Sequence, residues 1–360
     1  MPQVHTVRGP IDTAELGRTY MHEHVFVLTA DVQQNHPGEW GDEEQRVADA
    51  VEKLRALAAQ GVRTIVDPTV IGLGRYIPRI QRIADQVPEL NIVVATGCYT
   101  YGDVPFFFHY RGPGLSAALG TELPDPMVDM FVGDIVDGIA GTGVRASLLK
   151  CAIDHAGMTG GVERVMRAVA KAHRQTGAPV TVHTHPASRT GLEVKRVLCD
   201  EEGVDPRRVV LGHSGDSTDA DHLTELAEAG FILGMDRFGV NLDTTFEARA
   251  DIVVELCRAA SPGRWCSPRT PPATSTGSTR TSCPSCRSGT TSTSSRRCCP
   301  TCASTASPRS RSPRCWSTSP PLLRERLRLL TRPCTQNRDV GIPGYRAHLV
   351  HSCPDSGTLT

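Results

Sequence analysis

Short apolar runs recur along the first 260 residues, with glycine or polar residues at their ends. Runs of this kind are typical of strands buried in a parallel sheet. They predict seven strands, at His24–Leu28, Thr64–Val66, Ile92–Ala95, Ala146–Leu149, Val180–Val182, Val209–Leu211 and Phe231–Leu233.

Helical patterns lie between several of these runs. In residues 42–60 the apolar side chains recur on one face, and Gly61 can take the left-handed conformation that ends a helix. Residues 161–175 repeat this pattern before Gly177. Alternating strands and helices predict an α/β fold with a parallel sheet. Seven strands are one fewer than the eight of a (β/α)8 TIM barrel.

The pattern stops near Ser261, where the composition changes. Residues 1–260 hold 24 Lys and Arg against 36 Asp and Glu, whereas the last 100 hold 15 Arg, no Lys and three acids. The same 100 residues contain nine of the 13 cysteines, among many Ser, Thr and Pro. The formal net charge of zero therefore describes neither part. We interpret residues 1–260 as one ordered domain and residues 261–360 as an aberrant, disordered tail.

The given sequence shows no pattern typical of a secretory signal or a membrane span. No basic segment followed by an apolar run opens it, and no stretch approaches the ~20 apolar residues of a membrane span. The four cysteines of residues 1–260 are scattered, which suits a reducing compartment. We therefore expect a cytoplasmic protein with no membrane partner.

Histidine and lysine recur where the expected strands end, at His22 and His24, then Lys150, His183 and His213. Two histidines at i and i+2 of an extended segment point to the same side and can reach one cation, although a polar strand edge has the same pattern. A buried lysine at a strand end also pairs commonly with a carboxylate. Together, however, these residues predict a metal site, because barrel enzymes keep their sites at the carboxyl ends of the strands.

This order of His-x-His, strand-end Lys, His and Gly-His-Ser resembles the amidohydrolase superfamily. The local sequence motifs resemble its phosphotriesterase branch, especially the phosphotriesterase-like lactonases. The supporting segments are residues 21–24, 64–67, 71–75, 95–99, 183–185 and 234–239. The resemblance covers nearly all of residues 5–258.

The resemblance implies a (β/α)8 barrel with two divalent metal ions, zinc first, with cobalt, manganese or iron as alternatives. His22 and His24 would bind one ion, His183 and His213 the other, and a carboxylated Lys150 would bridge them. A hydroxide shared by the two ions would attack a lactone carbonyl, with side activity on phosphotriesters.

Two further residues, Tyr99 and Arg237, match positions that line the substrate pocket of the lactonases. Their alternative interpretation is a packed tyrosine and a surface ion pair. His185, on the same strand face, is expected to support the site or to be structural rather than to bind metal. The expected partners are a small lactone or organophosphate ester and, because the family often forms dimers, a second copy of the chain; no nucleic acid is expected.

One expected ligand is missing from the sequence. In the family the eighth strand ends in an Asp, which should follow soon after Arg258, but residues 261–270 are too rich in Pro and Ser for a central strand. If the same DNA is read in a frame that starts one nucleotide earlier, its codons permit Met-Val-Leu-Ser-Gln-Asp over this stretch. We infer a frameshift between Arg258 and Arg264, so that the chain as written lacks the closing strand, and we expect poor solubility and impaired hydrolysis.

Three alternatives remain open. The pairs Cys283/Cys286 and Cys299/Cys302 have the spacing of a zinc ribbon, although residues 288–297 offer no apolar side chain for a core. The enzyme could instead hydrolyse amide or ring C–N bonds, although Tyr99 and Arg237 favour the lactonase branch. The chain could also be a non-catalytic, misfolded metal-binding product.

Overall fold

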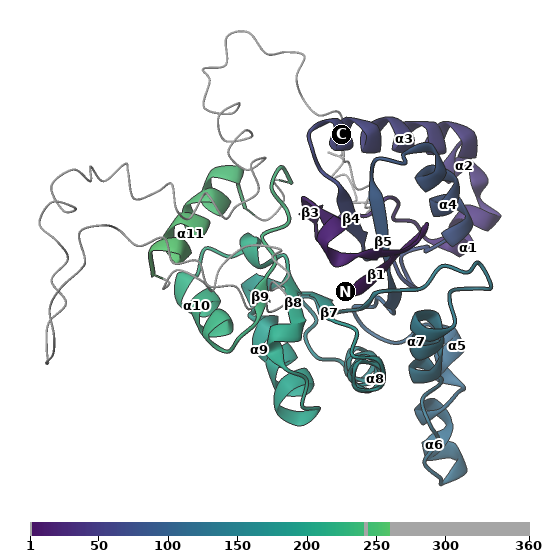
Figure 1. Ribbon diagram of the computed structural model, residues 1–360. Coiled ribbons are helices and arrows are strands. Elements are labelled where there is room, and N and C mark those ends of the chain that lie inside the picture. The colour runs from purple at the N-terminus through teal and green to yellow at the C-terminus, as the bar shows by residue number, and fades with distance from the viewer. Residues whose placement is uncertain (1, 241–243, 260–360) are drawn as a thin grey trace, which may run out of the picture. The chain divides into compact units, whose positions relative to one another are not determined.

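The computed structural model describes residues 2–240 and 244–259. Within these residues seven strands form one parallel sheet in the order β3-β4-β5-β6-β7-β8-β9 (Figure 1). This is the strand–helix architecture of the predicted barrel. The strands are β3 (Thr19–Tyr20), β4 (Thr64–Asp67), β5 (Asn91–Gly97), β6 (Leu148–Ala152), β7 (Val180–His183), β8 (Val209–Gly212) and β9 (Ile232–Leu233).

The first strand was predicted at the wrong place. It lies at Thr19–Tyr20 rather than His24–Leu28, because the chain leaves the sheet soon after His22. The amide of Glu23 still bonds the carbonyl of Val66, but the amide of Leu28 bonds Leu73 in the loop after β4. A backbone amide that a longer first strand would have bonded to β4 therefore bonds the loop after β4 instead.

Helices alternate with the strands along most of the sheet (Figure 1). They are α1 (Ala30–Asn35), α2 (Pro37–Trp40), α3 (Glu43–Ala59), α4 (Ile77–Gln86), α5 (Phe106–His109), α6 (Pro113–Leu119), α7 (Pro126–Val136), α8 (Gly160–Thr176), α9 (Thr190–Val194), α10 (Ala220–Glu228) and α11 (Phe246–Ala259). A short π-helical segment, Lys195–Glu201, continues α9.

Both helices predicted from apolar periodicity are present as α3 and α8. The side chain of Asp42 caps α3 by accepting a 2.8 Å hydrogen bond from the amide of Gln45. Gly177, at φ 70°, ends α8 in the left-handed conformation. The face of α8 that carries Val165 and Val169 packs into the main core beside β6. Each such buried aliphatic side chain contributes ~1.5–3 kcal/mol relative to exposure.

An antiparallel hairpin that the sequence did not predict precedes the sheet. It pairs β1 (Gln3–Thr6) with β2 (Gly9–Asp12). The amide of Val7 bonds the carbonyl of Ile92 in β5, and Ser147 bonds the backbone of His5. The hairpin is therefore attached at the amino ends of β5 and β6, away from the carboxyl ends where the candidate ligands lie.

The outer strands of the sheet, β3 and β9, each pair on one side only within the described residues. The eighth strand, expected after Arg258, and the tail with its cysteine pairs lie outside the described residues. None of the helices that the structure describes is both long and apolar enough to cross a membrane.

Candidate metal centre

The structure brings the four predicted ligand histidines together at the carboxyl ends of the strands. His22 follows β3, His183 ends β7 and His213 directly follows β8. The ring centroid of His22 lies 5.2 Å from that of His24 and 4.7 Å from that of His213. The ring centroids of His183 and His213 are 4.5 Å apart. Three segments that are far apart in the sequence thus contribute to one cluster of four imidazoles.

Lys150 belongs to the same region, but it lies inside β6 rather than at the strand end. Its side chain is fully buried, and its Nζ has no hydrogen-bond partner among the described residues. Burial lowers the pKa of Lys150 to about 8. An unpaired buried amine costs stability, so its place in the core calls for a functional explanation.

A glycine allows the backbone around Lys150 to pack closely. Gly97, the last residue of β5, has φ 139°, and a Cβ added there would lie 1.9 Å from the carbonyl oxygen of Lys150. The neighbouring amide of Cys98 donates a 3.2 Å hydrogen bond to that same oxygen. Only glycine permits this approach of β5 to β6.

Asp236 is a member of the cluster that the sequence analysis missed. Its Oδ1 accepts hydrogen bonds from the backbone amide of His213 at 3.1 Å and from the Nδ1 at 2.9 Å. Its Oδ2 lies 3.0 Å from Nδ1 of His22, at an angle that makes no hydrogen bond. His213 reaches the carboxylate by adopting a left-handed backbone, with φ 66°. One ligand atom from each of His22, His213 and Asp236 lies within 4.8 Å of the others, a spacing that suits a metal ion.

The charge of Asp236 also fixes the proton on His213. Burial alone would raise the pKa of Asp236, but the imidazoles of His213 and His22 hold it well below its ordinary value. An ionised carboxylate only accepts hydrogen bonds, so His213 carries its proton on Nδ1 and keeps the lone pair of Nε2 for another partner.

His183 is held in the opposite tautomer by Asp154, which follows β6. Its Nε2 lies 2.5 Å from Oδ2 of Asp154, and its Nδ1 lies 3.0 Å from the hydroxyl of Tyr99. Burial lowers the pKa of His183 to about 4, against the opposing effect of Asp154, so the ring is neutral at pH 7. The Nδ1 of His183 is therefore the nitrogen with a lone pair, and Tyr99 lies beside it.

Tyr99 and Arg237 both lie at this cluster. The Tyr99 hydroxyl also lies 2.5 Å from that of Tyr101. The charge of Arg237 acts on Lys150 and His183, where it is a secondary cause, after burial, of their lowered pKa values. Both side chains thus lie close to the clustered imidazoles, and their place in a substrate pocket stays a prediction.

Arg237 forms an ion pair with a buried carboxylate. Its Nη1 lies 2.7 Å from Oδ2 of Asp216, whose Oδ1 accepts hydrogen bonds of 3.0 and 2.5 Å from the fully buried Arg249 of α11. Asp216 thus joins two arginines and fixes the head group of Arg237.

His185, expected to support the site, bonds Ser188 through its Nδ1 at 2.8 Å. Its ring lies next to the ring of the exposed His155, with 6.3 Å between the two centroids, rather than next to one of the four clustered imidazoles. It takes no part in the hydrogen bonds that hold His183 or His213.

Imidazoles gathered at the carboxyl ends of parallel strands are typical of α/β-barrel hydrolases that use divalent metal ions. The sequence profile of the Phosphotriesterase family matches residues 2–264. The chain belongs to this family of metal-dependent hydrolases, as the motifs of the sequence predicted.

Relatives of known name agree with this assignment. The chain is 59% identical over 257 residues to a "Phosphotriesterase homology protein" of Mycobacterium tuberculosis, covering 71% of this chain and 77% of that one. It is 36% identical over 251 residues to an "Aryldialkylphosphatase" of Saccharolobus solfataricus, covering 70% and 76%. The solved structure of the phosphotriesterase from M. tuberculosis matches with a TM-score of 0.68 at 59% identity, covering 71% of this chain and 78% of that one.

Proposed function

We propose that this hydrolase is a lactonase with side activity on phosphotriesters, whose activity is impaired in the chain as written. The observation that carries the proposal is the position of Tyr99 and Arg237. The Tyr99 hydroxyl lies 3.0 Å from Nδ1 of His183, and Asp216 holds Arg237 beside the same cluster. The pair supplies hydrogen-bond donors to an ester or lactone oxygen at the edge of the imidazoles.

The proposed centre holds two divalent ions, with zinc as the first expectation. His22 and His24 would bind one ion, and His183 and His213 would bind the other. The donor set fits zinc, which prefers neutral imidazole nitrogens and carboxylate oxygens. Burial lowers the pKa of each of these four histidines and so favours the neutral ring that a metal requires.

Lys150 is proposed as the bridge, carboxylated on its amine. A carbamate would replace the unpaired Nζ by an anion with two oxygen donors. The pKa of about 8 favours this change, because a larger share of the amine is neutral near pH 7 than for an ordinary lysine. Carboxylation therefore explains both the burial of Lys150 and its lack of a hydrogen-bond partner among the described residues.

When bound, the ions would polarise the scissile carbonyl and supply an activated water. The protein's own residues do the positioning. Asp154 and Asp236 fix the orientation of His183 and His213, and Arg237 directs its guanidinium donors at the negative charge that develops on the substrate oxygen.

The impairment follows from the proposed domain boundary, with residues 1–260 as the hydrolase domain and residues 261–360 as an out-of-frame tail. Two observations support it. The family profile ends at residue 264, and the composition changes at the same place. The eighth-strand Asp, which would complete the ligand set and accept a proton, is then missing from the encoded sequence.

The test compares the 360-residue chain with a version in which the reading frame is restored between codons 258 and 264. Both are assayed with a lactone, a phosphotriester and an N-acyl amide, together with zinc content. We expect the restored protein to prefer the lactone and the chain as written to be at least tenfold slower. Equal lactonase activity in both proteins would refute the frameshift, and preference for the amide would support the C–N alternative. Absence of hydrolysis in both would favour a non-catalytic metal-binding product.

We also propose a homodimer. Phe106, Phe107 and Tyr110 of α5 and its C-terminal end expose 76%, 49% and 61% of their surface, an apolar patch of the kind that a second copy covers. Light scattering of the purified protein tests this, and a monomer at micromolar concentration would refute it.

A further inference from the structure

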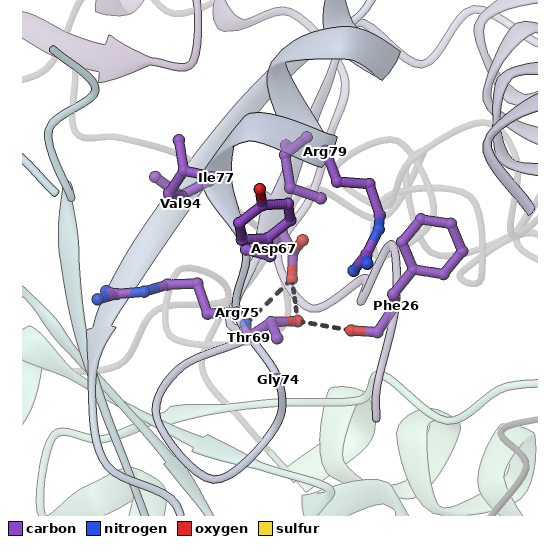
Figure 2. A pocket seen from close by; sticks show the side chains of 10 residues that line it. Phe26, Asp67, Thr69, Gly74, Arg75, Ile77, Arg79 and Val94 are labelled. Carbon is purple, nitrogen blue, oxygen red and sulfur yellow. Dashed lines mark hydrogen bonds between the residues drawn. The ribbon is translucent and has the colours of Figure 1, made fainter. Parts of the chain in front are cut away.

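His24 differs from its neighbours in how its second nitrogen is held. Its Nδ1 lies 2.7 Å from the hydroxyl oxygen of Thr69, whereas the nearest carboxylate oxygen, Oδ1 of Asp67, is 3.7 Å away. The hydroxyl of Thr69 in turn donates to Oδ1 of Asp67 at 2.5 Å, and the amide of Thr69 donates to the same oxygen at 3.0 Å. Figure 2 shows the Thr69 side chain pointing at both Asp67 and the carbonyl of Phe26.

The proton count in this chain of contacts has one solution. A threonine hydroxyl has one proton to donate and two lone pairs to accept with. With the Asp67 carboxyl ionised, as expected at pH 8, the other two partners of the Thr69 oxygen, that carboxylate and the Phe26 carbonyl at 3.2 Å, only accept. The proton of Thr69 is therefore committed to them, and the contact with His24 requires the proton of the imidazole.

We propose that Asp67 and Thr69 are positioning residues that fix His24 as the tautomer protonated on Nδ1, leaving the Nε2 lone pair for a metal ion. Asp236 imposes the same tautomer on His213 by direct contact, but Asp67 is too distant from His24 to do so. Thr69 bridges that gap. The inference rests on the proposed function only in assigning the free Nε2 to a metal; the tautomer itself is a property of the metal-free protein.

The location of the two residues favours a fixed arrangement. Asp67 ends β4 and Thr69 follows it, and their exposed fractions are 2% and 5%. Water therefore does not compete strongly for the Thr69 hydroxyl. An imidazole in water favours the opposite tautomer, with the proton on Nε2, so the expected state is one that the protein must impose.

The decisive experiment is ¹⁵N NMR of the full-length, metal-free chain with labelled histidine at pH 8. Two-bond correlations to the ring carbons' protons distinguish the two tautomers, and the signal lost in His24→Gln identifies His24. We expect Nδ1 protonation in the wild type and in Thr69→Ser, which keeps the hydroxyl. In Thr69→Val, which is close in shape, we expect the proton to move to Nε2.

Thr64→Val is the matched control. Thr64 is the first residue of β4, the strand that Asp67 ends; it is fully buried and donates a 2.6 Å hydrogen bond to the carbonyl of Leu16 rather than contacting a histidine. We expect it to leave the His24 tautomer unchanged. Protonation on Nε2 in the wild type would overturn the proposal, and this measurement needs no variant of Thr69 to fold.

A zinc titration by competition with a chelator gives the second measurement. Loss of the relay should weaken zinc binding by about 10–100-fold in Thr69→Val, with Thr69→Ser close to the wild type. Wild-type zinc affinity in Thr69→Val would overturn the positioning role. A wild type that binds no zinc, yet carries the proton of His24 on Nδ1, would instead refute the proposed metal centre and leave the tautomer assignment standing.

Discussion

Asp236 bonds His213 twice, through the backbone amide at 3.1 Å and through Nδ1 at 2.9 Å. Both bonds end on Oδ1, while Oδ2 lies 3.2 Å from the same amide and 3.0 Å from Nδ1 of His22. The amide nitrogen of Asp236→Asn would replace Oδ2 and face that backbone amide with a second donor, and the side chain would lose its negative charge. We expect this change to lower zinc affinity by about tenfold or more, because the carboxylate that orients His213 is lost. Zinc competition measures it.

A surface substitution of the same type controls for this change. Asp200→Asn removes an exposed carboxylate that pairs with Lys195 at 2.9 Å. Asp200 bonds an exposed lysine rather than an imidazole of the cluster, so the zinc affinity of Asp200→Asn should match that of the wild type. Equal zinc affinity in Asp236→Asn and Asp200→Asn would contradict the role of Asp236.

Lys150→Met should remove most of the bound zinc. The same substitution should not destabilise the metal-free protein, because it replaces an unpaired buried amine by an apolar chain of similar length. Metal analysis and urea denaturation check the two halves. Full zinc content in Lys150→Met would show that this lysine is not a ligand.

The pH dependence of stability gives an independent measure of Lys150. Its pKa is lowered from 10.5 to about 8 in the folded state, so between these pH values the unfolded chain binds more protons than the folded one. Stability of the metal-free protein from this residue is therefore lost as the pH falls from 10.5 to 8, by on the order of 3 kcal/mol. Urea denaturation in CO2-free buffer should show this slope in the wild type relative to Lys150→Met; parallel curves would contradict the lowered pKa.

Asp216→Ala should destabilise the protein by ~3–5 kcal/mol, because it leaves the buried Arg249 without its carboxylate. Asp205→Ala is the control, since its partner Arg207 is exposed and the change should cost far less than loss of the buried pair. The double substitution Asp216→Asn with Arg249→Met should recover part of the loss. Chemical denaturation measures all three, and equal effects of the two alanine substitutions would contradict the buried pair.

Arg237→Met, made in the frame-restored protein, should lower kcat/KM for a lactone by about 100-fold while zinc content stays unchanged. In the proposed site the guanidinium would donate hydrogen bonds to the substrate oxygen, whereas other residues would hold the metal. Arg237→Lys keeps the charge but loses the forked donor geometry, so it should recover activity only in part. Unchanged kcat/KM in Arg237→Met would remove this residue from the substrate pocket.

The sequence predicted the sheet well because buried parallel strands are apolar throughout. Its error at the first strand has a local cause. Residues 24–28 are as apolar as a strand, but their backbone bonds the loop after β4, and only the folded chain shows that partner. The histidines were found because two of them, His22 and His24, stand in a His-x-His pair. Their assignment as ligands stays a prediction.

The carboxylates behind the histidines were missed for a different reason. Asp67, Asp154 and Asp236 look like ordinary acidic residues in the sequence. Each comes near its imidazole, directly or in the case of Asp67 through Thr69, only because of the strand order in the folded sheet. A signal was nevertheless present, because each lies at the end of a predicted strand or within a few residues of it. Residues 260–360 lie outside the part of the chain that the structure describes, so the frameshift also stays a prediction.

The close approach at Gly97 has a consequence for protein engineering. The proposed site puts Tyr99 and Arg237 in the substrate pocket, which makes them natural positions to diversify in a search for new substrates, and Gly97 lies only two residues from Tyr99. Even alanine at position 97 would place a methyl group 1.9 Å from the Lys150 carbonyl oxygen and force β5 away from β6. A mutant library that includes position 97 would therefore lose the site in nearly every member, whereas one that begins at Tyr99 would sample selectivity with the lysine in place.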